Sequence, residues 1–168
     1  LNDGDQLLSF DETPKLLNSI KLTGTTNNNL SIGLLNAITD KSYALIRDNN
    51  DNVRKELISP LTNFNILSLS QKIINDYSMI GFINGNLNRD SSFENANNYA
   101  FMASLFDNNR NFNFRGYFYK TVAPKLSQKS GTRSIFSLSE LKGNFRYWLS
   151  INATDRYYNQ NEIGFFNQ

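Results

Sequence analysis

The sequence predicts an all-β protein built as an antiparallel meander of hairpins. Segments of about ten residues alternate apolar and polar side chains, which is the period of a strand with one apolar face. Clusters of Asn separate these segments, and Asn favours turns because its side chain caps its own backbone and tolerates left-handed dihedral angles. Few segments have a helical period. Alternating segments bounded by such turns are typical of consecutive hairpins.

Seven segments are predicted to be strands. They cover residues 19–25, 29–37, 62–71, 77–88, 99–106, 111–121 and 143–154. The turns are expected at Asn-rich stretches, namely 25–29, 48–52, 94–98 and 107–111. Within the third segment the apolar positions change phase after Ile66, which predicts a β-bulge. The best candidate for a helix is 52–59, which is short enough to be only a turn.

Segments 111–121 and 143–154 place one set of side chains on each face of a sheet, because successive side chains of a strand point to opposite sides. The apolar set consists of Phe112, Phe114, Phe118, Phe145, Tyr147, Leu149 and Ile151. The polar set consists of Asn113, Arg115, Asn144, Arg146 and Asn152. The polar set would make a poor soluble core, since buried polar groups need hydrogen-bond partners.

Three architectures accommodate this alternation. A two-sheet sandwich with one solvated face would show the same pattern, although its strands are usually about five or six residues long. A soluble eight-stranded barrel of the lipocalin type fits the length of the chain. A transmembrane barrel would turn the apolar set toward lipid and the polar set toward a lumen. The alternation leaves the membrane barrel and the soluble alternatives open.

Composition excludes several kinds of function. The 168 residues form about one domain, taken as residues 1–168. The 17 basic and 15 acidic residues are scattered, which does not predict nucleic-acid binding. The absence of Cys and His excludes disulfides, the usual zinc sites and catalysis that depends on either residue. We therefore expect no enzymatic activity and no cofactor.

Two acidic segments are candidates for metal binding or catalysis, and neither is convincing. Asp48, Asn50 and Asn52 have the spacing of a calcium loop, but Val53 and Ser59 stand where that loop requires Gly and Glu. We expect an Asn-rich turn there and no metal. A second cluster near the start of the chain is expected to be solvated, and it consists of Asp3, Asp5, Asp11 and Glu12.

Four segments, taken in order, resemble the domain-of-unknown-function family 5916. They are residues 31–48, 54–71, 78–90 and 155–168. The runs that carry most of the resemblance are 35–39, 60–64 and 161–165, and the similarity extends from about Pro14 to Gln168. In this family of Bacteroidetes proteins, a carbohydrate-binding domain similar to family 9 precedes a large outer-membrane β-barrel.

The resemblance implies that the antiparallel meander forms part of a transmembrane outer-membrane β-barrel in a Gram-negative bacterium. Its role would be that of a pore or scaffold without catalysis. Its partners would be membrane lipid, the remaining strands of its own barrel and other outer-membrane proteins. An alternative is a surface protein that binds or processes a glycan through a domain upstream of this chain. A second alternative is a soluble lipocalin-like ligand-binding barrel.

Overall fold

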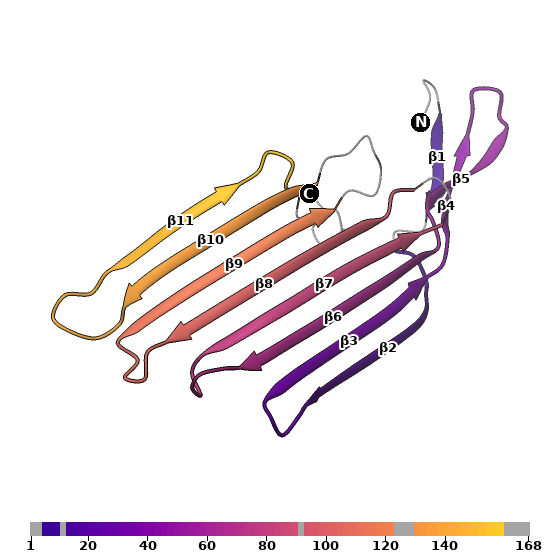
Figure 1. Ribbon diagram of the computed structural model, residues 1–168. Coiled ribbons are helices and arrows are strands. Elements are labelled where there is room, and N and C mark those ends of the chain that lie inside the picture. The colour runs from indigo at the N-terminus through magenta and orange to yellow at the C-terminus, as the bar shows by residue number, and fades with distance from the viewer. Residues whose placement is uncertain (1–4, 11–12, 91–92, 123–129, 160–168) are drawn as a thin grey trace.

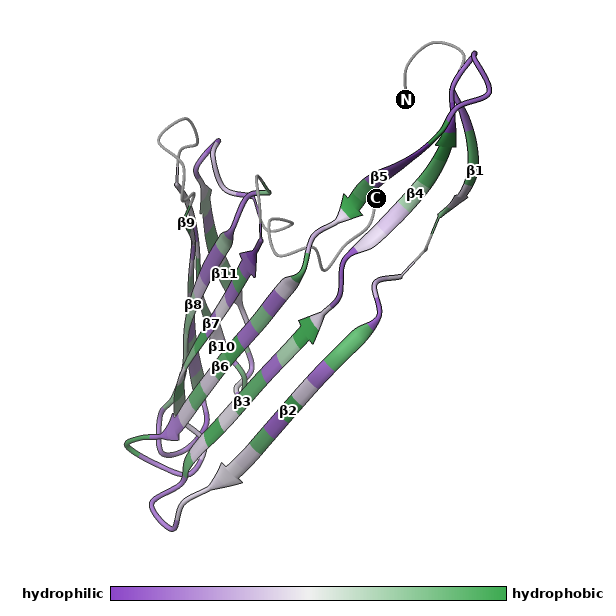
Figure 2. Ribbon diagram, turned by 90° about the vertical axis from the view of Figure 1, so that its right-hand side faces the viewer, coloured by the Kyte–Doolittle hydropathy of each residue, from purple (hydrophilic) through white to green (hydrophobic). Residues whose placement is uncertain are grey.

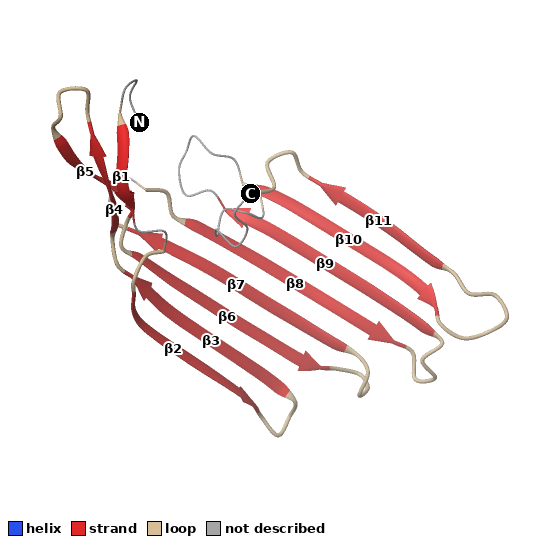
Figure 3. Ribbon diagram, turned by 180° about the vertical axis from the view of Figure 1, so that it is seen from behind, coloured by secondary structure: helices blue, strands red, loops and turns tan. Residues whose placement is uncertain are grey.

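The computed structural model describes residues 5–10, 13–90, 93–122 and 130–159, and it shows an all-β fold. Every strand pair is antiparallel, and the described residues contain no helix (Figure 3). Accordingly, none of the described segments is a helix long and apolar enough to cross a membrane. The predicted all-β antiparallel class is therefore confirmed.

Most of the chain forms one sheet of eight strands. These are β2 (Leu16–Thr25), β3 (Leu30–Thr39), β6 (Thr62–Lys72), β7 (Met79–Arg89), β8 (Ala96–Phe106), β9 (Phe112–Val122), β10 (Gly131–Glu140) and β11 (Trp148–Thr154). They lie side by side in the order β11-β10-β9-β8-β7-β6-β3-β2 (Figure 1). No pairing joins the outer strands β2 and β11 within the described part of the chain, so no closed barrel is found there. Figure 2 shows that the sheet is curled rather than flat.

A small sheet of three strands continues one end of this larger sheet. Its strands are β1 (Gln6–Phe10), β4 (Ser42–Arg47) and β5 (Val53–Ser59). Their order, β1-β4-β5, matches the order β2-β3-β6 of the strands to which they connect (Figure 1). Pro60 lies between β5 and β6, where pairing stops, because proline has no backbone N–H for a strand ladder. Lys41, between β3 and β4, forms an ion pair of 2.8 Å with Asp90, the residue after β7.

Short turns close the opposite end of the larger sheet. Asn29 in the β2–β3 turn and Arg110 in the β8–β9 turn have positive φ angles of 61° and 57°. The Asp107 carboxylate accepts the Phe112 N–H at 2.7 Å and so stabilises the second of these turns. Three of the four predicted Asn-rich turns are confirmed, whereas the fourth stretch already enters β8 at Ala96.

Segment 52–59, the best helix candidate, is a strand. It forms β5, whose register with β4 extends from Val53 opposite Arg47 to Ser59 opposite Ser42. A segment this short forms a marginal helix by itself, because helix nucleation is costly. Pairing with β4 supplies its backbone hydrogen bonds instead, so the prediction of a helix or turn was wrong.

No bulge interrupts β6. Its register with β3 and with β7 is continuous. Phe64 and Ile66 lie on one face and Leu67 and Leu69 on the other, since the alternation of side chains continues without a break. Apolar side chains therefore occupy one face at one end of the strand and the opposite face at the other end. The predicted bulge was wrong.

The last predicted strand begins later than expected, at Trp148 of β11. Gly143 has a φ of +116°, which L side chains rarely adopt, so the strand does not extend back through it. The Glu140 N–H donates to the Tyr147 carbonyl at 3.0 Å and closes the β10–β11 connection. Five residues predicted to lie in the strand are therefore in this connection, namely Gly143, Asn144, Phe145, Arg146 and Tyr147. The sequence analysis also missed β1, β4 and β10.

Buried apolar side chains are few among the described residues. They are Ala44 and Ile46 in β4, Leu87 in β7 and Ala96 in β8. Substantial contacts join only strands that are hydrogen-bonded neighbours, so no second layer of described residues covers either face of the larger sheet. Each face is therefore itself a candidate functional surface.

Candidate functional site

The strand register assigns the side chains of the larger sheet to two faces. Directly opposed residues on neighbouring antiparallel strands point to the same side. Phe82, Phe101 and Phe118 oppose one another across β7, β8 and β9, and we name their side the aromatic face. Arg115 in β9 and Arg133 in β10 lie on the other side, which we name the arginine face.

A band of apolar side chains crosses all eight strands on the aromatic face. It extends from Ile20 and Leu22 in β2 to Leu149 and Ile151 in β11, and these four side chains are exposed. Figure 2 shows the alternation of hydrophobic and hydrophilic residues along β2, β3 and β6 that produces such a band. An exposed, continuous apolar surface of this width is a feature of interaction sites rather than of a free surface in water.

Aromatic rings pack side by side within this band. The ring centroids of Phe82 and Phe101 are 4.9 Å apart, and those of Phe101 and Phe118 are 6.4 Å apart. Ala103 and Gly116 lie beside this row, where their small size contributes to an apolar hollow of about 610 Å³. Cross-strand aromatic pairs of this kind stabilise neighbouring strands and fix their register.

The strand residues of the predicted apolar set all lie on the aromatic face. They are Phe112, Phe114, Phe118, Leu149 and Ile151. Phe145 and Tyr147 complete the predicted set, but they lie in the β10–β11 connection, with ring centroids 6.3 Å apart. The contact of this face with lipid stays a prediction.

The predicted polar set is divided in the same way. Asn113, Arg115 and Asn152 lie on the arginine face, whereas Asn144 and Arg146 lie in the β10–β11 connection. Asn113 is buried, and its amide donates hydrogen bonds to the Ser104 hydroxyl and the Leu105 carbonyl. The structure brings Arg115 and Arg146 to one hollow, which the sequence spacing alone did not indicate.

Asparagine side chains form a belt on the aromatic face, at the end nearest the small sheet. The belt consists of Asn36, Asn63, Asn65, Asn84, Asn86, Asn88 and Asn97. The Asn36 amide donates to Asn63 Oδ1 at 2.6 Å and to Asn65 Oδ1 at 2.8 Å. The Asn84 amide donates to Asn97 Oδ1 at 2.7 Å. Sequence analysis missed this belt, although Asn at every second residue near the end of β7 was a usable signal.

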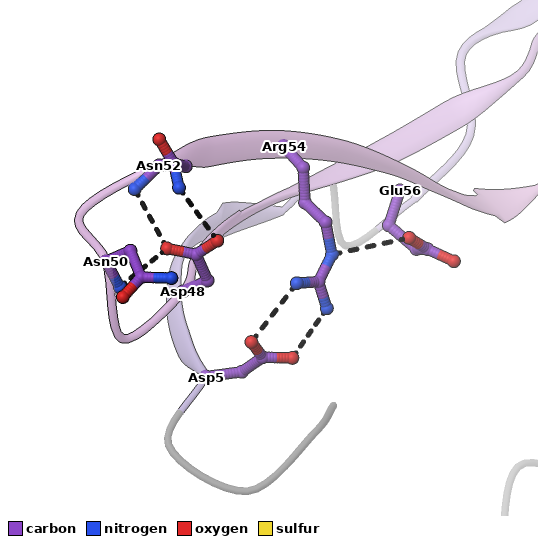
Figure 4. Close-up of polar contacts among 6 residues, drawn as sticks. All are labelled: Asp5, Asp48, Asn50, Asn52, Arg54 and Glu56. Carbon is purple, nitrogen blue, oxygen red and sulfur yellow. Dashed lines mark hydrogen bonds and ion pairs between the residues drawn. The ribbon is translucent and has the colours of Figure 1, made fainter.

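In the small sheet, Arg54 of β5 is tied to the residue before β1 (Figure 4). Its guanidinium donates two hydrogen bonds to the Asp5 carboxylate, at 3.2 and 2.5 Å, and lies 3.8 Å from the Glu56 carboxylate. The Asp5 side chain is only 4% exposed, so Asp5 is not the solvated residue that was expected. The other members of the predicted acidic cluster, Asp3, Asp11 and Glu12, lie outside the described residues.

Asp48 organises the β4–β5 turn (Figure 4). Its carboxylate accepts the backbone N–H groups of Asn50 at 2.8 Å and Asn52 at 2.9 Å, and it also accepts the Asn52 amide at 3.2 Å. The predicted Asn-rich turn is therefore confirmed. Within the described residues, no group of three or more His, Cys, Asp or Glu side chains could hold a metal ion.

Asp48 is expected to titrate at a lower pH than an ordinary Asp. The hydrogen bonds from Asn52 and Asn50 favour the carboxylate and so lower the pKa of Asp48. Because the folded pKa lies below the unfolded value of about 3.9, this group stabilises the turn above that pH and ceases to do so as the pH falls through the folded pKa. Carbon-13 NMR titration of the Asp48 carboxyl group measures this pKa. Asn52→Ala, which removes one donor, should raise the midpoint, and a wild-type midpoint at or above the unfolded value would contradict the expectation.

Together, the register, the exposed aromatic band and the asparagine belt define, in the described part of the chain, an antiparallel sheet protein with two chemically different faces. The chain belongs to the family described as Domain of unknown function (DUF5916), whose model matches residues 1–168. The resemblance to that family is therefore confirmed. No curated protein and no solved structure matches the chain.

Proposed function

We propose that this chain is a segment of a transmembrane β-barrel in the outer membrane of a Gram-negative bacterium, with the role of a pore wall or scaffold and no catalytic activity. The aromatic face would contact lipid, and the arginine face would line the lumen. The exposed apolar band across all eight strands carries this proposal. In water this band would remain exposed to solvent, which is unfavourable for apolar side chains. The hydrocarbon of a bilayer would cover it.

The strand pairing supports the same proposal. Backbone groups in hydrocarbon must all be hydrogen-bonded, and antiparallel strands achieve this between neighbours. The outer strands β2 and β11 are each paired on one side in the described chain. Their second sides would need further strands of the same barrel or other outer-membrane proteins, because lipid does not tolerate an open sheet edge. Lipid and these strands are the proposed partners.

The connections between strands support one orientation. At one end of the larger sheet the turns are short, the longest comprising residues 141–147. At the other end, residues 40–61 connect β3 to β6 and include two strands of the small sheet. Membrane barrels have short periplasmic turns and longer extracellular loops. The small sheet would therefore lie outside the cell.

The height of the apolar band can be compared with the apolar thickness that a membrane barrel presents to lipid. In β9 the band extends from Phe112 to Phe118, which is about 20 Å along the strand at about 3.3 Å per residue. Membrane barrels have apolar bands about 25 Å tall. Bilayers adapt to a shorter band by local thinning. The asparagine belt would then meet the lipid head groups.

Spin labels on single cysteines in β9 test the proposal, and the chain has no natural Cys to interfere. Labels replace Phe114 and Phe118 on the aromatic face and Arg115 and Tyr117 on the arginine face. In phospholipid vesicles that hold the chain together with the strands that complete its barrel, the first pair should collide often with oxygen, which concentrates in hydrocarbon. The second pair should instead collide often with a neutral, water-soluble nickel chelate.

Labels that show no alternation between neighbouring positions would overturn the proposal. Strong nickel contact at Phe114 and Phe118 would place the aromatic face in water. A chain that stays monomeric in buffer without lipid, and that unfolds there in one cooperative transition, would favour the soluble lipocalin-like barrel instead.

A further inference from the structure

Charged side chains are divided unequally between the two faces of the larger sheet. Its strands contain six basic residues and one acidic residue. Lys120 and the acidic residue, Glu140, lie on the aromatic face. The other five basic residues lie on the arginine face, and they are Lys21, Lys72, Arg89, Arg115 and Arg133. By register, the strands therefore give the arginine face five basic residues and no acidic one, although Glu140 at the end of β10 also borders the hollow described next.

Two arginines line one hollow at the β10–β11 end of this face. The hollow has a volume of about 460 Å³, and its walls include Arg115, Arg146, Ser137, Ser139 and Trp148. Glu140 also contributes to the wall. Neither arginine forms an ion pair with a described carboxylate, that of Glu140 included. Both residues are also exposed, so among the described residues their guanidinium groups are accessible to an external anion.

We propose that this hollow binds the oxyanion group of a solute, such as a carboxylate or a phosphate. The inference rests on the proposed function for the lumenal position of the hollow. Guanidinium groups present a planar set of donors that matches carboxylate and phosphate oxygens. The hydroxyl group of Ser137 adds a further donor beside them, whereas the Ser139 hydroxyl donates to the Asn113 carbonyl at 3.4 Å.

A third arginine extends the positive surface along the same strand. Arg133 lies four residues before Ser137 in β10 and therefore on the same face. Its Nε atom is buried and has no hydrogen-bond partner among the described residues. Several like charges on one surface raise the local concentration of counter-ions. Arg133 would thus attract anions toward the hollow.

The test measures the local concentration of an anion beside the hollow. A spin label at Ser137→Cys reports collisions with the anionic complex tris(oxalato)chromate and with a neutral nickel chelate. A potential of one kT concentrates even a monovalent anion about threefold. We therefore expect the ratio of anionic to neutral collisions to be at least about threefold higher at Ser137 than at a label replacing Asn86 in the asparagine belt.

Substitutions then locate the attraction. Arg115→Gln combined with Arg146→Gln should lower the ratio at Ser137 to the value at Asn86. Lys120→Gln is the matched control on the aromatic face and should leave the ratio unchanged. Equal ratios at the two labels in the wild-type chain would overturn the inference, as would a raised ratio that the double substitution leaves intact.

Salt dependence keeps the inference testable if the double variant does not fold. In 1 M salt the Debye length falls to about 3 Å, so the excess of anionic collisions in the wild-type chain should disappear. An excess that persists at high salt would refute an electrostatic site. A lack of oxygen contact at Phe114 and Phe118 would contradict the proposed function. A lack of selectivity for the anionic complex at Ser137 would contradict this inference, so the two failures are distinguishable.

Discussion

Phe101→Lys is expected to destabilise the chain in a lipid bilayer by about 2–4 kcal/mol, the cost of a basic side chain on the lipid face near the bilayer midplane. Phe101 lies at the centre of the aromatic face, between Phe82 and Phe118. Phe101 is 49% exposed, so in water a lysine there would keep its charge hydrated and lose only ring contacts. A large cost therefore indicates hydrocarbon around this position.

The measurement is the free energy of unfolding by urea in phospholipid vesicles, followed by the fluorescence of Trp148, the single tryptophan of the chain. Ala100→Lys is the matched control, because Ala100 precedes Phe101 in β8 and lies on the arginine face. The control should cost much less, since a lumen provides water. Equal costs for the two substitutions would show that the faces do not differ in their surroundings, against the proposed function.

Leu87→Ala is expected to cost about 2–5 kcal/mol of unfolding free energy, the range for removing a buried leucine side chain. Leu87 is 1% exposed and lies on the arginine face near the small sheet. It directly opposes Phe64 in β6 and Ala96 in β8. Truncation leaves a cavity among these side chains, and neighbouring strands relax only partly to fill it.

The same urea titration measures this loss, and Leu22→Ala is the control. Leu22 is 60% exposed on the outer strand β2, so its truncation removes few contacts within the protein. A loss at Leu87 no larger than that at Leu22 would mean that packing of Leu87 against Phe64 and Ala96 does not stabilise the sheet. The two substitutions together therefore distinguish the stability that comes from packing within the chain from the stability that comes from contact with its surroundings.

The alternation of side chains predicted the long strands well, because it is a local property of each segment. β2, β3 and β6 to β9 lie close to the predicted ranges. The helix candidate at 52–59 failed because a short segment adopts the structure that its neighbour offers, and β4 offers a ladder. The strand from Gly143 failed for a different reason, since a positive φ is not visible in the alternation.

The candidate surfaces were less predictable than the strands. The predicted sets did separate onto opposite faces in β9 and β11, since the spacing of Phe112, Phe114 and Phe118 already places them together. The asparagine belt was missed because Asn favours turns. Hydrogen bonds between strands, such as those from Asn36 to Asn63 and Asn65, explain why Asn occupies strand positions here. Those residues are far apart in the chain and meet only through the register.

By itself, the sequence determined the all-β antiparallel class, the two-sided character of the strands and the membership of the chain in its family. These properties depend on side-chain periodicity, turn chemistry and ordered motifs, all of which are local or collinear with the chain. The predicted meander already paired consecutive strands, whereas only the tertiary structure decided that β3 pairs with β6, where the small sheet begins and which arginines share a hollow. These features depend on pairing between distant segments, which the periodicity of a single segment does not specify.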